Sequence, residues 1–141
     1  MEEEIRANAE MVGRELGKLS GKELGYTQEG VEWLEGYIER LRNSAEFQDA
    51  EIRNKLTGMF GCFLGECIVR QYGGAWVQHE GVWCVAFSDD NMAFPFAKVA
   101  KQFENGLEDG ILSFFSVIPV LFKGGEPSVT PTSQKPWWKF W

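Results

Sequence analysis

The sequence has little of several residue types that common sites and partners need. It holds one histidine and 3 cysteines in 141 residues, and its 14 lysines and arginines are outnumbered by 21 aspartates and glutamates. The net charge of −7 argues against nucleic acid as a partner, because binding to phosphates needs a basic stripe. With a single histidine, any mechanism that uses an imidazole depends on His79 alone.

Long apolar runs are missing too. No run approaches the roughly 20 residues that a membrane-spanning helix needs. The chain begins with Met1 and three glutamates, unlike the basic and apolar start of a secretory signal. An odd number of cysteines among apolar neighbours favours reduced core thiols over a disulfide framework. These features predict a cytoplasmic protein.

Aromatic residues, in contrast, are abundant, with 6 tryptophans and 11 phenylalanines. A chain of this length can bury a core of its own without staples. We expect one α+β domain over residues 1–122, made of an N-terminal helix in residues 1–25 and a core in residues 26–122. Residues 123–141 are rich in Gly, Pro, Ser and Thr and end in five residues that are mostly aromatic, which predicts a flexible segment with an aromatic tail.

The apolar spacing predicts four to five helices. Thr27 is a plausible N-cap for the second of them. The central helix covers about residues 50–72 and is apolar nearly all round, as a buried helix is. Gly58, Gly61 and Gly65 fall in one of its sectors, where another backbone could approach closely, and Gly73 should end it. The first helix has a narrow apolar stripe formed by Ile5, Ala9, Val12, Leu16 and Leu19.

A small antiparallel sheet should follow. Residues 75–87 form a hairpin around the two-residue turn Glu80-Gly81, so that Val77 faces Cys84 and His79 faces Val82. Residues 92–96 predict a short edge strand, because Pro95 cannot lie in a central one. Helices over residues 98–105 and 108–118 complete the predicted fold.

Three residues are candidates for catalysis. Glu66 is a carboxylate in an apolar helix, which suits a general base, but an i,i+4 ion pair with Arg70 is the favoured interpretation. His79 and Cys84 could form a nucleophilic pair, although a surface histidine and a core thiol explain them better. A small hydrolase or transferase is thus an alternative only. The cysteine and histidine spacing fits no metal site, and we expect no cofactor.

The spare aromatic residues suggest binding instead. Three alternatives stay open for the tail: it docks in a partner's groove, it lies at a membrane interface, or it folds back on its own domain. Self-association also stays open. The candidate binding residues are Trp76, Trp83, Trp137, Trp138, Phe140 and Trp141.

The middle of the chain resembles a family of small uncharacterised bacterial proteins, a domain of unknown function. The resemblance covers about residues 26–122 and rests on Gly61-Cys62-Phe63-Leu64-Gly65-Glu66-Cys67-Ile68, on Tyr72-Gly73-Gly74-Ala75-Trp76-Val77 and on Phe94-Pro95-Phe96 through Glu108-Asp109-Gly110. It implies a shared α+β fold and no catalytic residue. Gly110 stands where such proteins would have a serine, which leaves open how the following helix is capped.

Taken together, the sequence predicts a non-catalytic module that binds a protein or peptide. An immunity-type or stress-related role follows only by analogy with other small acidic bacterial domains, since fold does not imply function.

Overall fold

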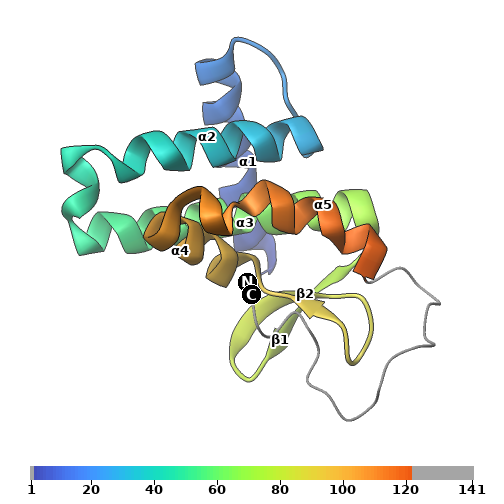
Figure 1. The fold of residues 1–141 in the computed structure, drawn as a ribbon. Coiled ribbons are helices and arrows are strands. Elements are labelled where there is room, and N and C mark those ends of the chain that lie inside the picture. The colour runs from blue at the N-terminus through green and yellow to red at the C-terminus, as the bar shows by residue number, and fades with distance from the viewer. Residues whose placement is uncertain (1, 122–141) are drawn as a thin grey trace.

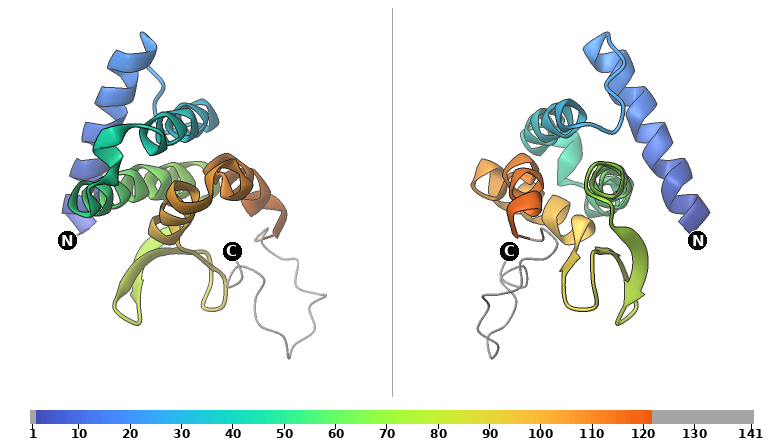
Figure 2. Two further views of the ribbon diagram at one scale, coloured as in Figure 1. Left: turned by 60° about the vertical axis from the view of Figure 1, so that its left-hand side comes forward. Right: turned by 90° about the vertical axis from the view of Figure 1, so that its right-hand side faces the viewer.

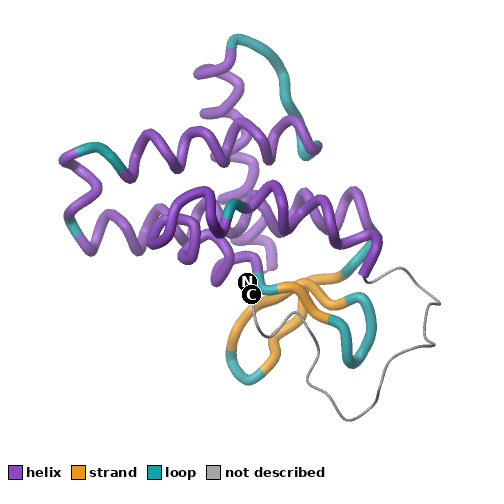
Figure 3. Tube along the Cα trace, viewed as in Figure 1, coloured by secondary structure: helices purple, strands orange, loops and turns teal. Residues whose placement is uncertain are grey.

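The protein folds into a group of helices with a small antiparallel sheet on one side, which confirms the predicted α+β class. The computed structural model describes residues 2–121. Figure 1 traces the chain, and Figure 3 shows the strands gathered on one side of the helices. The elements are α1 (Glu2–Ser20), α2 (Gln28–Arg42), α3 (Ala50–Tyr72), β1 (Ala75–His79), β2 (Val82–Ala86), β3 (Met92–Ala93), α4 (Pro95–Asn105) and α5 (Ile111–Leu121), with short 3-10 turns at Ala45–Gln48 and Gly106–Asp109.

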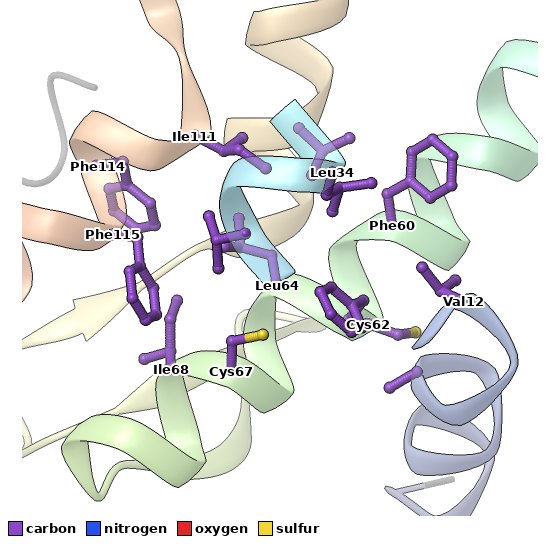
Figure 4. Packing of buried hydrophobic residues seen from close by; sticks show 14 of the residues in the cluster. Val12, Leu34, Phe60, Cys62, Leu64, Cys67, Ile68, Ile111, Phe114 and Phe115 are labelled. Carbon is purple, nitrogen blue, oxygen red and sulfur yellow. The ribbon is translucent and has the colours of Figure 1, made fainter. Parts of the chain in front are cut away.

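Helix α3 is the centre of the molecule. Every residue from 60 to 68 is buried, which confirms the prediction of a helix that is apolar nearly all round. Figure 2 shows α1 on one side of α3 and α5 on the other. Figure 4 shows the core between them, where Phe115 of α5 lies close to Ile68 and Val12 of α1 lies near Cys62. The helix thus holds together elements from both ends of the described chain.

The predicted helix ends are confirmed where local chemistry sets them. The Thr27 hydroxyl accepts a hydrogen bond from the Gly30 N–H at 3.1 Å and caps α2. Asp49 caps α3 in the same way. Gly73 ends α3 with a φ of 87°, a left-handed conformation that costs a glycine little. One part of the α1 prediction is wrong: Leu19, expected on the buried stripe, is 45% exposed.

The hairpin has the predicted register. Val77 pairs with Cys84, and His79 pairs with Val82. Glu80 and Gly81 both have positive φ, at 54° and 81°, as a tight two-residue turn requires. Strand β2 lies between β1 and β3, so the sheet is a simple meander.

The segment after the hairpin corrects the prediction. The third strand covers only Met92–Ala93, and Pro95 begins α4 instead of lying in an edge strand. Proline suits the first helical position for two reasons. Its fixed φ is helical, and an N–H at that position would have no acceptor within the helix, so its absence costs no hydrogen bond. Helix α5 likewise begins at Ile111 and not at residue 108, since the preceding residues form a 3-10 turn.

The glycine stripe of α3 admits rings and not a backbone, contrary to the expectation. A Cβ at Gly61 would overlap the ring of Phe96, and a Cβ at Gly65 would overlap the indole of Trp76. Gly58, in contrast, has nothing within 4 Å of the place where its Cβ would be. The stripe is therefore filled at its C-terminal end and open at its N-terminal end.

The start of α5 is capped by side chains from two other helices. Glu35 of α2 accepts from the Leu112 N–H at 3.1 Å, and Gln102 of α4 accepts from the Ile111 N–H at 3.0 Å. Burial raises the pKa of Glu35, while the Leu112 N–H opposes that rise. A Cβ at Gly110 would overlap the Glu35 carboxylate, so a serine could not occupy this position without a shift. Helix α5 is therefore capped by Glu35 and Gln102, and a serine at position 110 is not needed.

Candidate functional site

Glu66 is the most buried carboxylate among the described residues, with 2% of its surface exposed. Its Oε1 lies 3.1 Å from the Arg70 Nε, which confirms the predicted ion pair. Its Oε2 accepts a hydrogen bond from the Trp76 indole N–H at 2.9 Å and lies 3.8 Å from the Arg6 Nε. The carboxylate therefore joins α1, α3 and β1.

These contacts give Glu66 a structural role. A general base needs a free oxygen that faces the proton it removes, whereas both oxygens of Glu66 already face donors. The ring of Tyr26 covers the Arg70 guanidinium at 4.4 Å, which further closes the cluster. The indole of Trp76 was not foreseen as the partner, because a turn separates it from α3 and no helical spacing relates the two residues.

The structure does not bring His79, Cys84 and Glu66 together into a catalytic arrangement. Cys84 is fully buried, and its thiol donates to the Met92 sulfur at 3.8 Å. Burial raises the pKa of Cys84, which disfavours the thiolate that a nucleophile needs. His79 lies near the hairpin turn, with its Nε2 3.6 Å from the Glu80 carboxylate.

The other two cysteines are buried thiols as well, and they belong to no group of potential metal ligands among the described residues. Cys62 and Cys67 are free and buried, and burial raises the pKa of both thiols. Within residues 2–121, no three His, Cys, Asp or Glu side chains are grouped so that they could hold a metal ion.

Lys98 on α4 is a buried cation that sequence reasoning missed. It is 5% exposed, and its ammonium lies 5.2 Å from the centroid of the Phe114 ring. Burial, together with the charge of Lys101, lowers the pKa of Lys98 to about 7. An amine of this kind could act as a nucleophile if substrate reached it. Its burial and its absence from the linings of the two hollows described below argue for packing instead.

An apolar groove lies where α1, α2 and α3 meet, and we call it the α1–α2–α3 groove. Its volume is about 200 Å³. Met11, which contributes to its lining, is 50% exposed. Glu15 is the one charged residue in the lining, which consists of Met11, Val12, Glu15, Leu16, Tyr37, Leu56, Met59 and Phe60.

A second hollow, of about 280 Å³, lies on the outer face of α2. All of its lining comes from this one helix, and the Arg40 guanidinium already lies 5.9 Å from the Trp33 ring. A site on a single helix encloses little of a ligand. The groove formed by three helices is the better candidate.

The predicted binding aromatics fall into three groups. Trp76 is buried and bonded to Glu66, so the expectation that it contacts a partner has to be revised. Trp83, opposite Gln78 on the hairpin, is half-buried and packs against the core, and its role in binding stays a prediction. The other four, Trp137, Trp138, Phe140 and Trp141, lie outside the described residues.

Within residues 2–121, no helix has the length and apolar character needed to cross a bilayer.

Comparison of the chain with family models, with curated proteins and with solved structures gave no significant match. The resemblance to a bacterial family of unknown function therefore remains a prediction.

Proposed function

We propose that this protein is a non-catalytic module that binds an apolar peptide segment of a partner protein in the α1–α2–α3 groove. The observation that carries the proposal is the groove itself, an apolar hollow built by three helices with Met11 half-exposed in its lining. The polar candidates for chemistry support the same conclusion, because Glu66 is bonded on both oxygens and Cys84 is sealed in the core.

The size and lining of the groove indicate what kind of segment it would accept. A protein cavity of about 150 Å³ holds a benzene molecule, so about 200 Å³ has room for one large aromatic or branched side chain. Met11 and Met59 are flexible and polarisable, which suits contact with rings of several shapes. We therefore expect an anchor such as Trp, Phe or Leu on a helical or extended peptide, as in other helix-in-groove complexes.

The test is selection of peptides from a random displayed library with the full chain, followed by affinity measurements on synthetic peptides by fluorescence polarisation. We expect enriched peptides to share an aromatic or aliphatic anchor. Met11→Glu should weaken their binding by about tenfold or more, since it places a charge against the buried anchor at a cost of more than about 1.4 kcal/mol.

Val82→Glu is the matched control. Val82 is 48% exposed, close to the 50% of Met11, but it lies on the hairpin and not in the groove. Its substitution should leave the affinity unchanged. Failure to enrich any peptide, or equal binding by the Met11→Glu variant, would contradict the proposed function.

A further inference from the structure

We infer that the groove also accepts a segment of this same chain: the aromatic segment, residues 137–141, which competes with a partner peptide. This inference rests on the proposed function, because it takes the α1–α2–α3 groove as a peptide site. The segment Trp137-Trp138-Lys139-Phe140-Trp141 contains four candidate anchors of the size that the groove can hold.

The charge of the two parts is complementary. Residues 122–141 carry three lysines and one glutamate, whereas the chain as a whole has a net charge of −7. Lys139 lies between the candidate anchors, and Glu15 lies in the groove lining. When one ring enters the groove, a neighbouring lysine can lie against Glu15 at the rim, where an exposed ion pair helps orientation more than affinity.

The connecting residues are long enough to reach the groove. Helix α5 packs on the C-terminal end of α3, where the Phe115 and Tyr72 ring centroids are 4.9 Å apart. From Tyr72 back to Met59 in the groove is about 20 Å along the helix axis, at about 1.5 Å per residue. Residues 122–136 can span up to about 50 Å at about 3.3 Å per residue. Because α1 and α5 lie on opposite sides of α3 (Figure 2), the connecting residues would have to pass around the helices, and the remaining length allows this.

Tethering makes even a weak contact significant. A short linker gives an attached segment an effective concentration in the millimolar range. A free peptide would therefore have to displace the aromatic segment before it occupies the groove. The partner affinity measured with the full chain would be lowered accordingly.

The experiment uses methyl NMR of the full chain with ¹³C-labelled methionine. The chain has 4 methionines, of which Met11 and Met59 line the groove, while Met92 is buried in β3. The comparison variant replaces Trp137, Trp138, Phe140 and Trp141 with serine, and we call it the four-serine variant. A docked ring should shift the Met11 and Met59 methyl signals upfield in the full chain, and the shift should disappear in the four-serine variant.

The Met92 signal is the internal control and should stay in place, which shows that the four-serine variant keeps the fold. Identical Met11 and Met59 signals in the two proteins would overturn the inference. A shift that returns when unlabelled full chain is added to the labelled four-serine variant would also overturn it, because the ring would then come from a second copy. Loss of the shift on addition of phosphatidylglycerol vesicles would instead assign the segment to a membrane surface.

Affinity measurements separate this inference from the proposed function. Selected peptides should bind the four-serine variant several-fold more tightly than the full chain, because the competing segment has gone. Equal affinities, still sensitive to Met11→Glu, would refute the competing segment and leave the groove as the peptide site. Absence of binding to the four-serine variant would refute the proposed function itself.

Discussion

The two halves of α3 differ in how completely neighbouring side chains fill the space beside them. Around the C-terminal half, the rings of Phe96 and Trp76 occupy the space above Gly61 and Gly65, and Glu66 is bonded on both oxygens. Around the N-terminal half, the space above Gly58 is open, and Met59 lines a groove. One helix therefore has a closed end and an open end.

This difference shows where to look for function in a chain that lacks a recognisable catalytic motif. A charged residue in an apolar helix, such as Glu66, suggests a functional site in a sequence. Here, however, all the partners of Glu66 belong to its own domain. Apolar side chains that lack neighbours are the more informative feature, since burial of their surface on binding would be favourable.

The largest effect is expected from alanine at the glycines of the stripe. Gly65→Ala would force the Trp76 indole out of its place and disturb its bond to Glu66, at a cost of about 3 kcal/mol or more. Gly58→Ala is the matched change at the open end and should stabilise the protein by up to about 1 kcal/mol, because alanine favours a helix. Urea unfolding of both variants measures the difference, and equal effects would refute the contrast.

Removal of the indole donor should have the next largest effect. Trp76→Phe keeps a ring against Gly65 but leaves the buried Glu66 oxygen without its N–H partner, which we expect to cost about 1–3 kcal/mol. Thermal unfolding measures this cost. Trp83→Phe on the same hairpin is the control, since that indole does not donate to Glu66, and a cost as large as that of Trp76→Phe would contradict the assignment.

Lys98 should produce a smaller effect that depends on pH. Its pKa is about 7 in the folded protein and 10.5 without perturbation, so the unfolded chain holds the extra proton between these values. Stability should therefore rise with pH through this window, and the cost of burying the ammonium is fully present below pH about 7. Lys98→Met should stabilise the protein more at about pH 6 than at about pH 9, as urea midpoints would show. Lys55→Met, at an exposed position of α3, should show no such difference; a pH-independent gain for Lys98→Met would contradict the assignment.

The smallest effect is expected at the groove. Met11→Glu, which should weaken peptide binding, should change the free energy of unfolding by no more than about 0.5 kcal/mol, because Met11 is half-exposed. Circular dichroism during urea unfolding provides the measurement. A cost comparable to that of Trp76→Phe would mean that Met11 belongs to the core and not to an open site.

The features that the sequence predicted correctly are those set by neighbouring residues. The Thr27 cap, the Gly73 stop and the hairpin register each depend on a few adjacent positions. The Glu66–Arg70 pair follows from helical spacing. Such local chemistry acts in the same way whatever the rest of the fold does.

The features that it missed depend on segments far apart in the chain. The Trp76 indole reaches Glu66 only because the hairpin folds back on α3. The groove has no signature in one helix, since Met11 lies off the apolar stripe of α1 and the hollow forms only where three helices come together. The sequence predicts a strand over residues 92–96, because no local signal shows that the strand ends early enough for Pro95 to begin a helix.

The capping of α5 has a consequence for the cooperativity of unfolding. An isolated helix of 11 residues is marginal in water, and the first N–H groups of α5 are bonded by Glu35 and Gln102, which α2 and α4 supply. Helix α5 therefore cannot stay ordered once α2 or α4 leaves its place. We expect its amide hydrogens to exchange with solvent at least as fast as those of α2 and α4, because every opening of either helix also releases α5.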